Sequence, residues 1–141
     1  MSRVLALDFG EARCGCALSD PSRTLATPLE AIEQPDTRRG MQRIAALVRE
    51  RDVELVVVGL PLSLSGEEGP QALRTREWAG RLAARLHVPV ELHDERLTTK
   101  QAERTGGSAD EDSRAAAHLL EGWLARQTGG SPGPGGPGGA S

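Results

Sequence analysis

The segment at residues 54–60, Glu-Leu-Val-Val-Val-Gly-Leu, constrains the fold more than any other part of this chain. A short, nearly continuous apolar run is typical of a strand that is buried on both faces. The preceding segment carries Met41, Ile44, Ala45 and Val48 at helical spacing, so a helix is expected to lead into the strand. A helix followed by a strand indicates a crossover connection, which is right-handed in α/β proteins.

The first third of the chain predicts three strands joined by short loops. Residues 3–8 form a second apolar run, typical of a central strand, and residues 14–19 follow after a turn that contains glycine. Residues 24–32 form a weaker strand that Pro28 interrupts, which suits the edge of a sheet. Because the connections are short, these strands are expected to form an antiparallel meander.

The remainder of the chain predicts further helices and one more strand. A second helix carries an apolar stripe made of Ala72, Ala79, Leu82, Ala83 and Leu86. A fifth strand at 88–93 follows, then a short helix at 98–104, and a last helix that begins at the capping box Ser108-Ala109-Asp110-Glu111 and runs to about residue 126. The fold class expected is α/β: a mixed five-stranded sheet, with a three-strand antiparallel meander and then two parallel strands, flanked by helices.

Length and composition predict a single domain. The 141 residues, 38% of them hydrophobic, suffice for one sheet covered by helices over residues 1–127. A disordered tail is expected at 128–141, because residues 129–141 are only Gly, Pro, Ser and Ala. The chain has neither an apolar run of about 20 residues nor a signal-type N-terminus, so a cytoplasmic protein without membrane contact is expected. Its net charge of −3 argues against nonspecific coating of nucleic acid.

Asp8 is the first candidate site residue, because it puts a carboxylate where an apolar strand ends. Burying this group without a partner would be costly, so a positively charged partner is expected. A metal ion is the partner that would bring chemistry to the position. Glu95 and Asp112 are the acidic residues downstream that could share such an ion.

Asp112 lies on the apolar side of the last helix. Ala116, Leu119 and Trp123 fall within about 40° of it at 100° per residue, whereas Asp110 falls on the opposite face. For the fifth strand, alternation puts Asp94 with Val90 and Leu92, and Glu95 with Glu91 and His93. Alternation alone leaves open which of these two carboxylates faces the site.

Three carboxylates favour hard divalent cations, since Mg²⁺ and Mn²⁺ prefer oxygen ligands. Two such ions about 4 Å apart could activate water and stabilise the leaving oxygen in phosphodiester hydrolysis. Cys14 and Cys16 form only a C-x-C pair, so we interpret them as buried apolar residues. His118 lies far round the helix from Asp112 and is interpreted as a surface residue.

Four blocks of the sequence resemble one family, the YqgF/RuvX-type pre-16S rRNA nucleases, which are related to Holliday-junction resolvases and have the ribonuclease H-like fold. The blocks are residues 7–10 with Arg13, Gly15 and Ser19-Asp20; residues 57–62 leading to 66–72; residues 94–99 with Ala102; and Asp112 with Ala115-Ala116. The resemblance covers about residues 3–126 and implies that Asp8, Glu95 and Asp112 hold Mg²⁺ or Mn²⁺. It also implies action on RNA, in maturation of the 5′ end of pre-16S rRNA, and favours Glu95 over Asp94.

Arginines are the candidates for substrate binding, because the segment before the last acidic residue is shorter and less basic than is usual in that family. Arg13 and Arg96 stand near the proposed site, and Arg74 and Arg76 follow the Gly-Pro-Gln loop. The partner expected is RNA. One alternative partner is DNA, cleaved at junctions, which calls for a homodimer where RNA cleavage allows a monomer. The other alternative is a non-catalytic RNA-binding factor in ribosome assembly. An actin-like ATPase is disfavoured, since one such domain cannot form the interdomain cleft and the sequence shows no second phosphate loop.

Overall fold

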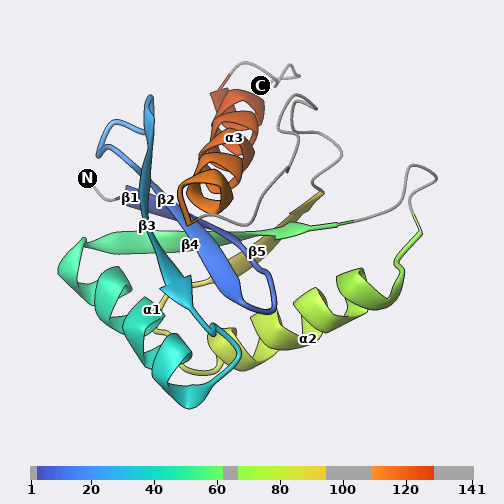
Figure 1. The fold of residues 1–141 in the computed structure, drawn as a ribbon. Coiled ribbons are helices and arrows are strands. Elements are labelled where there is room, and N and C mark those ends of the chain that lie inside the picture. Colours follow the sequence, from blue (N-terminus) through green and yellow to red (C-terminus); the bar gives the residue numbers. More distant parts are fainter. Residues whose placement is uncertain (1–2, 62–66, 95–108, 129–141) are drawn as a thin grey trace.

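The computed structural model describes residues 3–61, 67–94 and 109–128, with the side chains of 113–127 in the last segment. Over these ranges, five strands form one sheet in the order β3-β2-β1-β4-β5 (Figure 1). The elements along the chain are β1 (Arg3–Asp8), β2 (Arg13–Ser19), β3 (Ala26–Glu33), α1 (Arg38–Glu50), β4 (Val53–Leu60), α2 (Pro70–Ala83), β5 (Val90–Asp94) and α3 (Ala109–Thr128).

The sheet is mixed, as the sequence predicts. β2 pairs antiparallel with β1 and with β3, whereas β4 pairs parallel with β1 and with β5. The weak strand is at the edge, where Pro28 does not interrupt a ladder on its outer side. The chain therefore has the expected fold class, a three-strand meander followed by two parallel strands.

The sheet separates two apolar layers. α1 and α2 cover one face and α3 covers the other (Figure 1). In β1, Leu5 and Leu7 pack with α1 and α2, whereas Val4 and Ala6 pack beneath α3. This alternation explains why β1 is apolar at successive positions: both of its faces are covered.

The buried face of α2 differs from the predicted one. Ala83 is exposed, so its place in the apolar stripe was wrong, while Thr75 and Trp78 are buried. The reason is the size of Trp78, which is completely buried and stacks on Phe9 with ring centroids 4.4 Å apart. Burying a large aromatic ring outweighs burying a methyl group, so the helix turns its Trp78 side to the sheet.

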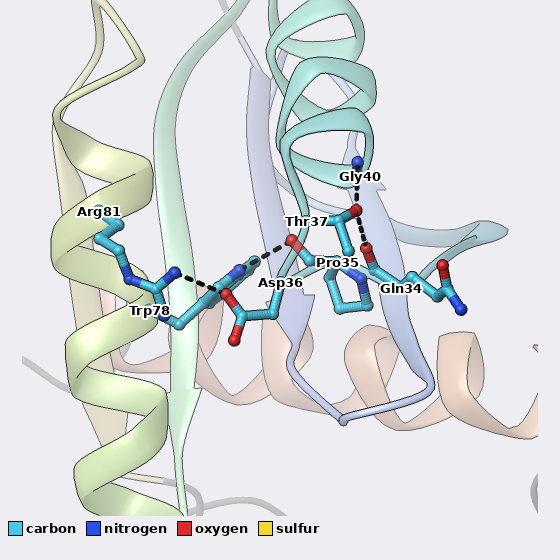
Figure 2. A network of polar contacts seen from close by, with 7 residues as sticks. All are labelled: Gln34, Pro35, Asp36, Thr37, Gly40, Trp78 and Arg81. Carbon is cyan, nitrogen blue, oxygen red and sulfur yellow. Dashed lines mark hydrogen bonds and ion pairs between the residues drawn. The ribbon is translucent and has the colours of Figure 1, made fainter.

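A polar network joins α2 to the loop between β3 and α1 (Figure 2). The Trp78 indole Nε1 donates to the Pro35 carbonyl oxygen at 3.0 Å, and Arg81 pairs with Asp36 at 2.7 Å. Thr37 caps α1 by accepting a hydrogen bond from the Gly40 backbone N–H at 3.0 Å. These contacts set the start of α1 against α2.

Glycine is required at Gly40. A Cβ there would lie 2.3 Å from the Gln34 carbonyl oxygen and 2.7 Å from the Pro35 Cα, so the loop passes too close for any side chain. The Gln34 backbone N–H also donates to the Ala12 carbonyl oxygen at 2.8 Å. The β3–α1 loop is therefore joined to the β1–β2 loop, which begins directly after Asp8.

Among the described residues, no helix is long and apolar enough to cross a membrane. The predicted short helix at 98–104, the Ser108 cap and the tail lie outside the described residues. The predicted domain boundary near residue 127 stays a prediction.

Candidate active site at the carboxyl edge of the sheet

Asp8 is a mostly buried carboxylate at the end of β1. Its side chain is only 8% exposed. Since Val4 and Ala6 pack beneath α3, alternation puts Asp8 on the α3 face as well. A carboxylate in this position is unusual in a strand whose other central residues are apolar, and it marks the place as a candidate site.

Both strands beside Asp8 carry glycine at the neighbouring position. Gly15 of β2 is its register partner, and on the other side the pairing of Leu7 with Val58 brings Gly59 of β4 next to Asp8. Gly59 in turn pairs with His93 of β5. Two strand spacings, about 10 Å, separate the Cα atoms of Asp8 and His93. No side chain from either neighbouring strand therefore stands directly beside the Asp8 carboxylate on this face.

The carboxyl ends of β1, β4 and β5 share one edge of the sheet, because these strands are parallel. In α/β sheets, ligands bind preferentially at such an edge. Asp8 is at the end of β1 and Asp94 at the end of β5. Glu95, the predicted ligand, follows Asp94 and lies outside the described residues, as does Arg96.

A hydrogen bond attaches the first turns of α3 close to Asp8. The Cys16 backbone N–H donates to the buried Ser113 hydroxyl at 3.4 Å, and Cys16 pairs with Leu7, one position from Asp8. Asp112 precedes Ser113 in α3, and its side chain lies outside the described part of the chain. The three residues that share its predicted face are all buried: Ala116, Leu119 and Trp123.

His93 is a site residue to which the sequence prediction gave no role. It is buried, and its Nε2 atom has no hydrogen-bond partner among the described residues. Burial, and then the positive charge of Arg126, lower its pKa, so the neutral imidazole is favoured. The sequence shows that His93 and Glu91 share one face of β5, but only the structure shows that this is the face that carries Asp8.

The orientation of Glu91 decides the face of β5. Its Oε1 accepts a hydrogen bond from the Trp123 indole of α3 at 3.1 Å. Glu91 and His93 therefore face α3, whereas Val90 and Leu92 pack on the other face. By the same alternation Asp94 points away from the face that carries Asp8.

Cys14 and Cys16 are buried free thiols, as expected. Burial raises the pKa of the Cys14 thiol well above its usual value, with further contributions from Cys16 and from the negative charge of Asp8. A thiol that stays neutral is a poor metal ligand. The hydrogen bonds that both thiols donate go to backbone carbonyls.

Of the predicted substrate-binding arginines, three are in the described part. Arg13 of β2 shares the α3 face with Ala17, and its register partner is Glu33 of β3. Arg74 pairs with Glu11, so it lies beside the loop that follows Asp8. Arg76 pairs with Glu68 instead, with Nε 3.2 Å from Oε1. Such exposed pairs are worth about 0–1 kcal/mol and can be exchanged for a phosphate.

Within the described ranges, no group of three or more His, Cys, Asp or Glu residues could hold a metal ion. Glu95 and the Asp112 side chain lie outside those ranges. The metal site therefore stays a prediction in which Asp8 is the described member. His118 is half-exposed, as expected, with its Nδ1 3.6 Å from Glu121 Oε1.

A family model described as "RuvX: Holliday junction resolvase" matches residues 2–126. The chain belongs to the RuvX family. Two relatives named "Putative pre-16S rRNA nuclease" match most of this RuvX-family chain. The Nocardioides sp. protein is 48% identical, covering 92% of each chain. The Gluconobacter oxydans protein is 42% identical, covering 86% of this chain and 82% of its own.

A solved structure has a similar fold to this RuvX-family chain. It is described as "T. thermophilus RuvC in complex with Holliday junction substrate", with a TM-score of 0.55 and 16% identity. The match covers 92% of this chain and 97% of that chain. The fold is therefore ribonuclease H-like, as the resemblance of the sequence implied.

Proposed function

We propose that this RuvX-family chain is a metal-dependent nuclease that hydrolyses RNA, in maturation of the 5′ end of pre-16S rRNA. The observation that carries the proposal is the surroundings of Asp8: a carboxylate only 8% exposed, with glycine on both sides, at the edge where the parallel strands end. The names of the two relatives favour pre-16S rRNA as the substrate.

The donor set of the proposal fits a hard divalent cation. Asp8 is one ligand, and Glu95 and Asp112 complete the set as oxygen donors suited to Mg²⁺ or Mn²⁺. Continued alternation beyond Asp94 would return to the α3 face, which favours Glu95 as the second ligand. When bound, one or two ions would lower the pKa of an attacking water and stabilise the charge on the leaving oxygen.

The protein's own residues orient the reactants in this proposal. Pairing of β1 with β2 and β4 holds the Asp8 backbone in place, and the glycines at 15 and 59 put no side chain beside its carboxylate. Arg13, on the same face, adds positive charge near that phosphate. Water attacks phosphorus, the bond to the 3′ oxygen breaks, and the products carry a 5′-phosphate and a 3′-hydroxyl.

The test compares cleavage by the wild type, Asp8→Asn and Gly59→Val. Substrates are single-stranded RNA, single-stranded DNA and a four-way junction, each with Mg²⁺, with Mn²⁺ and with chelator. Asp8→Asn should abolish cleavage, because it removes the charge that holds the cation. Gly59→Val should reduce cleavage at least about tenfold, because it puts a branched side chain beside Asp8, and circular dichroism shows that the fold is retained.

Wild-type activity in Asp8→Asn with Mn²⁺ would show that the acidic triad is wrong. Cleavage of the four-way junction in preference to RNA would favour the second candidate, DNA-junction resolution, which the description of the family model supports. That activity calls for a dimer that presents two sites, so the oligomeric state is measured alongside. No cleavage of any substrate would favour a non-catalytic assembly factor.

A further inference from the structure

Four arginines form an exposed basic surface around the start of α1, which we call the α1 arginine surface: Arg38, Arg39, Arg43 and Arg85. The side chains of these four arginines make no hydrogen bond or ion pair with another described residue. Arg74, Arg76 and Arg81, by contrast, are each paired with an acidic side chain. The α1 arginine surface therefore keeps its positive charge available to a partner.

Two neighbouring hollows give this surface its shape, and Thr37 lines both. One lies between α1 and the end of α2, with Arg38, Arg81 and Arg85 around it. The other lies beside the end of β3, with Arg39 and Arg43. Together they are lined by five arginines and two acidic residues, Glu33 and Asp36, in a protein whose net charge is −3.

Helix stability does not account for these charges. Arg38 and Arg39 occupy the first turn of α1, which contains no acidic residue. The N-terminal end of a helix is the positive end of its dipole, so basic side chains there are mildly unfavourable. Binding of an anionic partner is a physical reason for arginine at positions where glutamate or aspartate would stabilise the helix better.

The α1 arginine surface begins at the same edge of the sheet as the candidate site. β3 runs in the same direction as β1, so Glu33 and Asp8 both end their strands at that edge. Asp8 pairs with Gly15 of β2, and Arg13, two residues away on β2, pairs with Glu33. The Cα atoms of Glu33 and Asp8 are therefore separated by two strand spacings across the sheet and two residues along it, which is about 12 Å. A stacked strand covers that distance in three or four phosphates at about 3.4 Å each.

The recognition would use phosphates and not bases. Phe9, Trp78 and Trp123 are the only aromatic residues of types Phe, Trp and Tyr in the chain, and all three are buried. None of them can serve as an exposed platform for stacking bases. Contacts from arginine to phosphates are sequence-independent and strongly dependent on salt concentration.

We propose that the α1 arginine surface binds the phosphate backbone of the single-stranded RNA that flanks the cleaved bond. The proposal rests on the proposed nuclease function, since it extends the path of the RNA beyond the Asp8 site. Arg39 and Arg43 lie one helical turn apart on α1, so their side chains are neighbours and can contact adjacent phosphates.

The experiment measures binding of a fluorescent single-stranded RNA by anisotropy, with chelator present to prevent cleavage. Arg39→Gln/Arg43→Gln is compared with the wild type between about 50 and 200 mM salt. The control Arg49→Gln/Arg51→Gln removes the same charge from the other end of the same helix. Thermal unfolding of each variant shows that the fold is retained.

Loss of two phosphate contacts should make the slope of log K against log salt shallower by about 1.4. Binding should then weaken about 25-fold at 0.1 M salt, if the affinities converge near 1 M salt. The control should stay within about twofold of the wild type. Equal losses in both variants, or no loss in the Arg39/Arg43 variant, would overturn the proposal.

This experiment separates the surface from the chemistry. If the RNA binds through Arg39 and Arg43 but no substrate is cleaved, the nuclease function fails and the surface stands. If RNA is cleaved while the Arg39/Arg43 variant binds it normally, the surface fails and the function stands. Equal binding of vesicles with anionic lipid or of an acidic peptide would show a general anion surface and would overturn the assignment to RNA.

Discussion

Trp78→Phe tests the inference that one indole connects the candidate site to the β3–α1 loop. Trp78 is completely buried, stacks on Phe9 next to Asp8, and donates its indole N–H to the Pro35 carbonyl oxygen at 3.0 Å. Phenylalanine keeps an aromatic ring against Phe9 but has no donor and a smaller ring. The substitution therefore removes the connection to the β3–α1 loop while retaining most of the stack.

The expected loss in the free energy of unfolding is about 3 kcal/mol. Removing the donor leaves the Pro35 carbonyl, in a buried residue, without this partner, which costs about 1–2 kcal/mol. The space left by the missing part of the indole adds about 1–2 kcal/mol. Loss of the Pro35 contact should also loosen the start of α1, where Thr37 and Gly40 are joined (Figure 2).

Urea unfolding followed by far-UV circular dichroism measures this loss. Leu73→Ala is the matched control, because Leu73 lies on the same helix but is 55% exposed, and it should change stability by less than about 0.5 kcal/mol. The near-UV spectrum of Trp78→Phe at low urea reports whether the native packing is kept. A loss below about 1 kcal/mol for Trp78→Phe would refute the reasoning, because neither the hydrogen bond nor the ring volume would then matter.

Three further predictions concern stability. Gly40→Ala should destabilise the protein by more than about 2 kcal/mol, since its Cβ would meet the Gln34 carbonyl oxygen at 2.3 Å. Gly80→Ala, on an open part of α2, should stabilise the protein by about 0.5–1 kcal/mol. Chemical denaturation measures the free energy of unfolding of both variants, and equal changes would contradict both predictions. Hydrogen bonds from the Ser22 hydroxyl, the Leu25 backbone and Thr24 lower the pKa of Asp20 well below its usual value of 3.8. Ionised Asp20 therefore stabilises the folded state above about pH 4, and this stability is lost as the pH falls further. Asp20→Ala should make the free energy of unfolding depend less on pH in the acid range. An unchanged pH dependence would argue against a contribution from these hydrogen bonds.

Local patterns were sufficient for most of the fold. The apolar run at 3–8 gave β1 with the same bounds, and the run at 54–60 differs from β4 by one residue. These predictions succeed because burial on both faces requires apolar side chains at successive positions, which a reader of the sequence can see. The stripe of α2 was predicted less well, since periodicity does not weigh the size of Trp78 against that of Ala83.

Only part of the candidate site could be predicted from the sequence. Asp8 and the apolar side of α3 could be predicted from the sequence, because a carboxylate at the end of an apolar run and a helical stripe are both local features. Glu95 and Asp112 stay predictions as ligands. His93 was missed, because nothing local shows that its imidazole is buried, with no hydrogen-bond partner for Nε2 in the described part of the chain.

What the sequence determined by itself was the type and order of the elements, and which residues of a strand share a face. Only the tertiary structure decided which face each set occupies. The bond from Trp123 to Glu91 turns one side of β5 toward α3, and the register between strands puts Gly15 and Gly59 beside Asp8. The physical reason is that alternation is a property of one strand, whereas register and facing depend on contacts between residues far apart in the chain.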